Sequence, residues 1–136
     1  MANEWVGRLQ RGYEAFNRGD LDGVLRELGP TAPDIEFRDR PEAPDHSTYS
    51  GMDQVRFVMG QVGAEFDDYR IDPEEFVEVG ENIVVAVRQT GRGKLSGVPV
   101  DEVLFHVWVV RDDVVAGLQA YTEREDALRA AAEPAN

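Results

Sequence analysis

The sequence predicts an α+β fold in which helices come first and an antiparallel meander of strands follows. Two observations predict it. Apolar residues recur at helical spacing through roughly the first half of the chain, whereas from residue 69 onward runs of β-branched and aromatic residues are separated by turn residues. The 136 residues contain no internal repeat and no linker, so we expect a single domain spanning residues 1–136.

The N-terminal part of the chain predicts two helices. Asn3 is a candidate cap for a helix over Glu4–Arg18, which a glycine follows directly. Asp20 is placed to cap a second, shorter helix over Leu21–Leu28, ended by a Gly-Pro pair. The buried stripe of the first helix is predicted to consist of Trp5, Leu9, Tyr13 and Phe16.

A short strand over Asp34–Asp39 is followed by a proline-rich segment over Arg40–Ser50, which we expect to be irregular. This segment contains His46 and Tyr49. If it forms a rim or lid over a binding site, these two residues are ligand contacts; a solvated loop is the simpler alternative.

Two capping boxes predict the remaining helices. Ser50 with Asp53 predicts the start of a third helix that reaches about residue 66, and Thr122 with Glu125 predicts the start of a C-terminal helix that runs through residue 132. Between these helices the pattern predicts four strands with short turns and one longer glycine-rich connection. The predicted strands are Tyr69–Val79, Asn82–Thr90, Glu102–Val110 and a strand from 114 to 121.

One imidazole interrupts the most apolar of these strands. By alternation His106 shares a face with Leu104 and Trp108, and the opposite face is entirely apolar. A lone imidazole on a buried strand needs a hydrogen-bond partner, because an unsatisfied polar group is costly there. His106 therefore either projects into a cavity, where it can donate a hydrogen bond or act as an acid or base, or is a core histidine bonded to a neighbour.

Composition excludes several classes of function. The net charge of −13 repels phosphate backbones and anionic membranes, so we expect neither a nucleic-acid nor a membrane partner. No apolar run approaches the ~18 residues of a membrane span and no signal-peptide pattern is present, so we expect a cytoplasmic protein. Without cysteine there is no thiolate or disulfide chemistry, and His46 and His106 lie too far apart for a metal-ligand motif. We expect no metal and no cofactor.

Three local stretches carry a resemblance to a known superfamily. They are Tyr13–Asp22 (YEAFNRGDLD), Tyr49–Gly51 at the start of a helix, and Leu118–Tyr121 (LQAY) on the last strand. With the order of elements, they resemble the nuclear transport factor 2-like superfamily over about Glu4–Ala131, and within it the SnoaL-like subgroup. Ketosteroid isomerases, scytalone dehydratases, limonene epoxide hydrolases and polyketide cyclases belong to this superfamily.

The resemblance implies a cone-shaped, curved antiparallel or mixed sheet. Three helices from the N-terminal half of the chain pack on its concave face, and a short C-terminal helix completes it. The resemblance implies a pocket rather than a particular reaction, because members of the superfamily differ in what lines the cone.

The resemblance also implies roles for individual residues. His106 falls where ketosteroid isomerases carry the carboxylic acid of their oxyanion hole, and Asp39 falls where they carry the proton-abstracting aspartate. Asp39, flanked by two arginines, is equally well explained as a charged loop residue. The isomerases also use a tyrosine on the first helix; a direct count places Gly12 at that position and Tyr13 beside it, and a buried tyrosine bonded to backbone is the alternative.

Further residues are candidates for lining the cavity. Arg88 stands in an otherwise apolar strand, where it either pairs with Asp101 or Glu102 or anchors an anionic ligand. Together with Asp39 and Asp101 it resembles the Asp-Arg-Asp set of the epoxide hydrolases. A plain core predicts the same apolar residues as a pocket does. The apolar candidates are Trp108, Leu104, Met59, Phe66 and Leu118.

Two hypotheses of function follow. The first is a cofactor-independent acid/base enzyme (an isomerase, cyclase, dehydratase or hydrolase) acting on a small apolar carbonyl or polyketide-like compound, with His106, Asp39 and Tyr13 as catalytic residues. The second is a non-catalytic ligand-binding or dimeric accessory module that uses the same cone. The resemblance implies a homodimer formed through the sheet. On the strand that contains His106, the apolar side chains of the opposite face form an outward row: Val103, Phe105, Val107 and Val109. This outward row is apolar enough to need cover from a partner or a helix.

Overall fold

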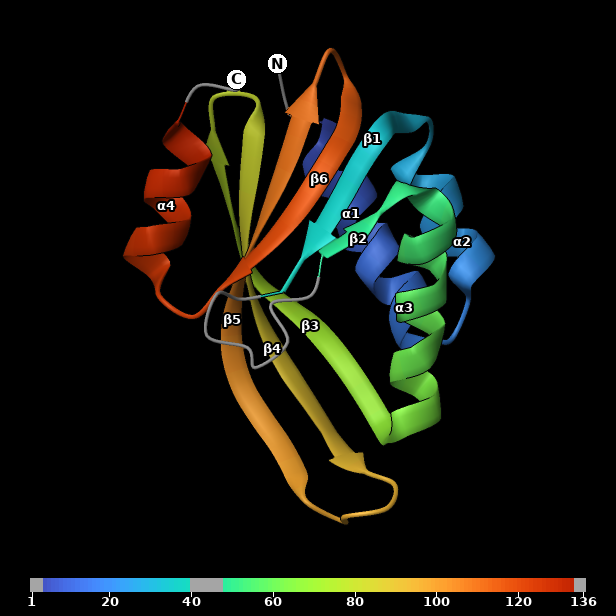
Figure 1. The fold of residues 1–136 in the computed structure, drawn as a ribbon. Helices are drawn as coiled ribbons and strands as arrows, with labels where there is room; N and C mark the ends of the chain where they lie inside the picture. Colours follow the sequence, from blue (N-terminus) through green and yellow to red (C-terminus); the bar gives the residue numbers. More distant parts are fainter. Residues whose placement is uncertain (1–3, 40–47, 134–136) are drawn as a thin grey trace.

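A computed structural model describes residues 4–39 and 48–133 of the chain. A curved sheet separates three helices on its concave side from a fourth helix on its outer side (Figure 1). The fold is therefore α+β, as the sequence predicts. The elements in chain order are α1 (Glu4–Asn17), α2 (Leu21–Leu28), β1 (Thr31–Arg38), β2 (Thr48–Ser50), α3 (Gly51–Glu65), β3 (Phe66–Val79), β4 (Asn82–Gly93), β5 (Pro99–Arg111), β6 (Val114–Tyr121) and α4 (Arg124–Ala132).

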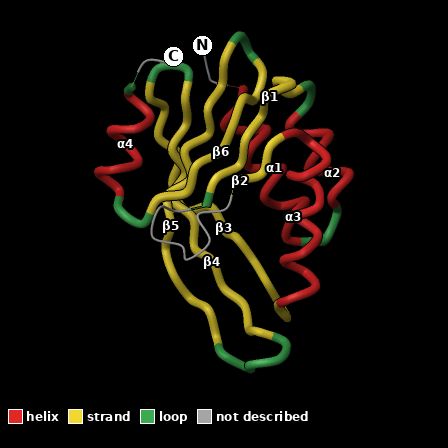
Figure 2. Tube along the Cα trace, in the orientation of Figure 1, coloured by secondary structure: helices red, strands yellow, loops and turns green. Residues whose placement is uncertain are grey.

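The described strands form one six-stranded mixed sheet in the order β2-β1-β6-β5-β4-β3, which is not closed into a barrel. Strand β1 runs parallel to β6, and the other neighbouring pairs are antiparallel. The hairpin of β4 and β5 extends well beyond the rest of the sheet (Figure 2). The curvature of this sheet creates the concave face against which α1, α2 and α3 pack.

A two-residue turn joins β5 to β6 where the sequence predicts one. Asp112 and Asp113 both have positive φ angles, 52° and 63°. Two consecutive residues of this kind form the turn whose twist matches that of the flanking strands, and aspartate tolerates this conformation better than most residues. The turn sets the register in which Arg111 lies opposite Val114.

Helix α2 begins as predicted, because the side chain of Asp20 accepts a hydrogen bond from the backbone N–H of Gly23 at 2.9 Å. The two helices for which capping boxes are predicted, α3 and α4, start within one residue of the predicted positions, but the residue at each N-cap makes no side-chain cap bond. Glu123 rather than Thr122 is the N-cap of α4, and it makes no side-chain cap bond. The cap of α3, Ser50, makes none either.

Strand pairing explains the difference at the start of α3. Ser50 ends the short strand β2, which pairs with β1 in a segment that we expected to be irregular. Its hydroxyl is directed towards Glu36 on β1, and its own N–H donates to Oε1 of Gln54 at 2.8 Å. The glutamine one turn into the helix therefore replaces the expected aspartate.

The sheet has an apolar layer on each face. The larger layer lies between the concave face and helices α1 to α3. The smaller layer lies under α4, where Val84 and Val107 pack against Ala127 and Ala131. Phe105 and Val109 pack against this second layer, and Val103, 45% exposed, is the exposed member of the outward row. The chain's own C-terminal helix thus covers most of the row on which the dimer prediction depends.

Candidate functional site

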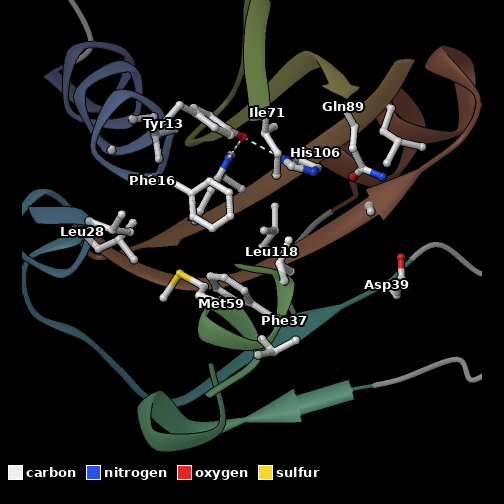
Figure 3. A pocket seen from close by; sticks show the side chains of 18 of the residues that line it. Tyr13, Phe16, Leu28, Phe37, Asp39, Met59, Ile71, Gln89, His106 and Leu118 are labelled. Atoms are coloured by element: carbon white, nitrogen blue, oxygen red, sulfur yellow. Dashed lines mark hydrogen bonds between the residues drawn. The ribbon is translucent and has the colours of Figure 1, made fainter. Parts of the chain in front are cut away.

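A pocket of about 210 Å³ lies between the concave face of the sheet and helices α1, α2 and α3 (Figure 3). Every element around it contributes through the side-chain positions that periodicity assigns to its inner face. Most of the wall is apolar, which suits an organic ligand. The lining residues are Leu9, Gly12, Tyr13, Phe16, Val24, Leu28, Phe37, Asp39, Val58, Met59, Val62, Tyr69, Ile71, Gln89, Leu104, His106, Trp108, Leu118 and Ala120.

Three buried polar side chains form a hydrogen-bonded chain in the wall of this pocket. The indole N–H of Trp108 donates to the hydroxyl oxygen of Tyr13 at 2.9 Å. The same hydroxyl lies 2.7 Å from Nδ1 of His106. Strand β5 presents His106 and Trp108 on one face because they are two residues apart, and α1 brings Tyr13 against both of them.

The hydrogen bonds of this chain orient the protons of Tyr13 and His106. An indole nitrogen can only donate, so the Tyr13 oxygen accepts from Trp108. Among the described residues Nδ1 of His106 is the acceptor available to the Tyr13 hydroxyl proton, and this arrangement gives every polar group of the chain a partner. Nδ1 then accepts, and a neutral imidazole carries its proton on Nε2. Figure 3 shows this second nitrogen pointing away from Tyr13. His106 thus holds a neutral N–H donor on the pocket side of its ring.

Burial shifts the pKa values of both residues towards their neutral forms. Desolvation lowers the pKa of His106 to about 4, so the imidazole is neutral at pH 7. Desolvation also raises the pKa of the Tyr13 phenol well above its usual range, and the bond from Trp108 offsets only part of that rise. The chain Trp108–Tyr13–His106 is therefore uncharged throughout.

A second polar group of residues lies towards the β3 side and the end of β1. Asp39 is exposed and lines the pocket together with Tyr69 and Gln89. Burial raises the pKa of the Tyr69 phenol, and the negative charges of Asp39 and Glu102 raise it further. Gln89 donates from Nε2 to Oε1 of Glu102 at 3.1 Å. Besides the hydroxyl of Tyr69, this side of the pocket carries acceptors and negative charge.

Among the residues predicted from sequence, the pocket brings together His106, Asp39 and Tyr13. Trp108, Leu104, Met59 and Leu118 line it as well. Arg38, one of the two arginines beside Asp39, donates to Glu36 at 2.7 Å. Because Asp39 and His106 both line the pocket, one bound ligand can contact both side chains.

Other predicted residues do not reach the pocket. Arg88 points to the outer face, where its guanidinium forms two hydrogen bonds, of 2.9 and 2.8 Å, with Asp101. Consecutive strand residues alternate between faces, so Arg88 is directed away from the side that Gln89 occupies. The Asp-Arg-Asp set of the epoxide hydrolases does not assemble in this structure.

Phe66 and Tyr49 are also outside the pocket lining. Phe66 packs against the ring of Tyr69, a lining residue, at 5.4 Å between centroids. Tyr49 lies on β2 opposite Phe37 of β1. His46 lies outside the described residues.

Gln89, Tyr69 and Phe37 are lining residues that the sequence reasoning missed. The signal for Gln89 was present in the sequence. Strand residues two positions apart share a face, so Gln89 lies on the inner face of β4 with Val85 and Val87. The other two depend on how far the sheet curls, which no local pattern encodes.

A second concavity of about 330 Å³ lies on the outer face of the sheet, beside α4. Four of its charged side chains form two ion pairs: Arg38 pairs with Glu36, and Arg111 pairs with Asp34 at 3.3 Å. The described residues contain no group of acidic or histidine side chains arranged to hold a metal ion. Within the same part of the chain, no helix combines the length and the hydropathy needed to cross a bilayer. The concave pocket is the candidate site.

The fold and the pocket define a class of protein: the nuclear transport factor 2-like cone. A protein of unknown function from Burkholderia pseudomallei with this fold is 25% identical, with 93% of this chain and 96% of that one covered and a TM-score of 0.75. A protein from Jannaschia, provisionally assigned as a SnoaL-like polyketide cyclase, is 22% identical over 97% and 92% of the two chains, with a TM-score of 0.68.

A third structure has a ketosteroid isomerase-like fold, comes from Catenulispora acidiphila and was solved in complex with trimethylamine. It is 13% identical over 93% of each chain, with a TM-score of 0.70, so the likeness is one of fold. Comparison with curated proteins finds no match. The SnoaL-like domain family matches residues 9–118, most of the chain, and the chain belongs to that family.

Proposed function

We propose that this protein binds a small, largely apolar carbonyl compound in the concave pocket and catalyses proton transfer on it without a cofactor. The observation that carries the proposal is the chain from Trp108 through Tyr13 to His106, which leaves a neutral N–H donor facing an apolar space. A donor in such a space binds a carbonyl oxygen more strongly than it would in water, because little solvent competes for it.

The chemistry assigns one role to each side of the pocket. The Nε2–H of His106 donates to the carbonyl oxygen of the ligand. The carboxylate of Asp39 removes a proton from the adjacent carbon, and the electron pair of the broken C–H bond moves into the enolate, whose oxygen His106 stabilises. Return of the proton from Asp39 to the same or another carbon completes exchange or isomerisation. Tyr13 does not touch the ligand in this scheme and acts by positioning His106.

Deuterium uptake tests this scheme directly. Acetophenone, incubated with the protein in D₂O, is expected to exchange its methyl protons faster than in protein-free buffer, as followed by ¹H NMR. Asp39→Asn is expected to abolish this acceleration while acetophenone still binds in a calorimetric titration. His106→Gln is expected to weaken binding about three- to tenfold, the value of one neutral hydrogen bond.

The exposed Arg88 provides a matched control, because Arg88→Ala removes a charged side chain that lies on the outer face of the sheet, away from the pocket. It is expected to leave both binding and exchange unchanged. Binding of acetophenone without any accelerated exchange would favour the alternative, a non-catalytic ligand-binding module. Absence of binding to the unaltered protein would reject both.

The homodimer remains a prediction. Helix α4 covers much of the outward row of β5, so the remaining apolar contribution of that row is mainly Val103. A dimer that uses the outer face would therefore include α4 or the exposed hairpin end of the sheet. Light scattering coupled to gel filtration tests it, and a monomer at all concentrations would contradict it.

A further inference from the structure

Gln89 has a fixed orientation in the wall of the pocket. It lies on β4 directly opposite Glu102 of β5, and its amide nitrogen donates to the Glu102 carboxylate at 3.1 Å. A carboxylate accepts hydrogen bonds and does not donate them, so the NH₂ group of Gln89 must face Glu102. The carbonyl oxygen of the amide is the end left for another partner.

This oxygen is open to the pocket. Among the described residues, no buried side-chain nitrogen or oxygen lacks a hydrogen-bond partner. Gln89 lines the pocket, and its oxygen makes no hydrogen bond to another residue that the structure describes. Figure 3 places Gln89 beyond the ring of His106, on the side away from Tyr13. The pocket thus presents a donor, Nε2–H of His106, and an acceptor, Oε1 of Gln89, along one face of the sheet.

Charge and size limit the ligand further. No described residue that lines the pocket is a lysine or an arginine, and Asp39 contributes a negative charge. A carboxylate or phosphate inside this wall would be desolvated without a counter-ion, which is strongly unfavourable. The volume of about 210 Å³ exceeds the roughly 150 Å³ of an engineered cavity that holds benzene, so one ring with substituents fits.

We propose that Gln89 is a specificity-determining residue, which together with His106 selects uncharged, one-ring carbonyl compounds that also carry a hydroxyl group. The carbonyl oxygen accepts from His106 and the hydroxyl donates to Gln89. Glu102 acts as a positioning residue, since it holds the amide in the orientation that accepts. This inference rests on the proposed function, because it assumes that a carbonyl compound occupies the pocket.

Calorimetric titration with four matched probes tests it: acetophenone, 3′-hydroxyacetophenone, 4′-hydroxyacetophenone and 4′-methoxyacetophenone. One of the two hydroxyl compounds is expected to bind about three- to tenfold more tightly than acetophenone, and the methoxy compound, which cannot donate, is expected to show no such gain. 4-Acetylbenzoate, an anion of similar shape, is expected to bind at least tenfold more weakly than acetophenone.

Two variants test whether the preference for a hydroxyl compound depends on the amide oxygen of Gln89 and on its orientation by Glu102. Gln89→Met keeps the length of the side chain but removes the acceptor. The ratio of affinities for the hydroxyl compound and acetophenone should therefore fall to about one. Glu102→Gln leaves Gln89 in place but can donate to its oxygen, so the same preference should fall there too. Arg88→Ala is the control that should retain it.

The outcomes distinguish this inference from the proposed function. If acetophenone binds but neither hydroxyl compound gains, or if the gain persists in Gln89→Met, the role of Gln89 is rejected and the carbonyl pocket stands. If 4-acetylbenzoate binds best, the inference of an uncharged ligand is rejected. If none of the probes binds to the unaltered protein, the proposed function fails and this inference fails with it.

Discussion

The indole nitrogen of Trp108 lies 2.9 Å from the hydroxyl oxygen of Tyr13, although the two residues are 95 positions apart in the chain. Since indole can only donate, the Tyr13 oxygen is the acceptor of this contact, and directing the Tyr13 hydroxyl proton to Nδ1 of His106 gives every group of the chain a partner. Trp108 therefore influences the position of the proton on His106 indirectly, through the hydroxyl of Tyr13. A change at Trp108 should reach the pocket through Tyr13.

Trp108→Phe tests that coupling. Without the indole N–H, the Tyr13 oxygen can also accept from a protonated Nδ1, so His106 is expected to populate both tautomers. Long-range ¹H–¹⁵N correlation spectra should show a single Nε2–H form in the unaltered protein and a mixture in the variant. Affinity for acetophenone should fall about three- to tenfold. A variant that keeps the single Nε2–H form would contradict the relay.

Tyr13→Phe removes the centre of the same chain. Both the Trp108 N–H and Nδ1 of His106 then lose their partner in a buried site, so the free energy of unfolding is expected to fall by about 2–4 kcal/mol. Urea denaturation measures this loss. A loss below about 1 kcal/mol would show that water or another group replaces the hydroxyl without cost.

Acid should destabilise the protein in a defined pH window. The folded-state pKa of His106, about 4, lies below the unfolded value of 6.5, so between these values the unfolded chain binds more protons. Stability due to this group is complete above pH 6.5 and is lost as the pH falls towards 4. The total is about 3 kcal/mol, from 1.36 kcal/mol per pH unit.

His106→Gln isolates this contribution, since its amide oxygen can accept from Tyr13 but does not titrate. Between pH 7 and pH 4.5 the unaltered protein should lose about 2–3 kcal/mol more stability than the variant, because the carboxylates titrate in both. Affinity for acetophenone should be constant between pH 5 and pH 8. An NMR titration that places the His106 midpoint near 6.5 would overturn both expectations.

Alternation along single strands made much of the site predictable. It placed His106, Leu104 and Trp108 on one face, and it would have placed Gln89 on the same face of the neighbouring strand. It could not pair His106 with Tyr13, because that contact joins residues 93 positions apart and depends on how α1 lies across the sheet. Local patterns specify which face a side chain takes, whereas its partner is set by tertiary packing.

The side-chain cap bond predicted for Ser50 is missing for a related reason. The spacing of Ser50 and Asp53 fits a capping box, but Ser50 is also the last residue of β2 and lies against Glu36 of β1. Ser50 is the N-cap of α3 by position, but its hydroxyl lies against Glu36 and makes no cap bond. For Asp20, which follows one helix and precedes another, no strand competes, and the predicted cap forms.

The side-chain amide of Asn17 on α1 forms two hydrogen bonds with the backbone of the edge strand β3, as a residue of a paired strand would. Its side chain accepts from the N–H of Ile71 at 2.8 Å and donates to the carbonyl oxygen of the same residue at 2.9 Å. Asn17→Ala should therefore lower the free energy of unfolding by about 1–3 kcal/mol and speed hydrogen exchange of the Ile71 amide.

The same substitution should also loosen the pocket, since Ile71 and Tyr69 line its β3 side. Asn17→Asp provides the comparison: it keeps the acceptor for Ile71 N–H but brings a second carboxylate against Asp72, which now accepts from Asn17 at 3.2 Å. It should be at least as destabilising as Asn17→Ala at pH 7. Unchanged exchange at Ile71 in both variants would show that β3 is held by β4 alone.

Two glycines should respond to alanine in opposite directions, because one is crowded and the other is not. A Cβ on Gly117 of β6 would lie 2.9 Å from the carbonyl oxygen of Glu36, within the parallel pairing of β1 and β6. That oxygen belongs to the backbone and can move only if the strands separate, so Gly117→Ala should cost about 1–3 kcal/mol. A Cβ on Gly63 of α3 would meet nothing within 4 Å, and alanine stabilises a helix relative to glycine by up to about 1 kcal/mol. Urea denaturation of Gly63→Ala and Gly117→Ala side by side measures both effects, and stabilisation by both would contradict the close approach of the two strands.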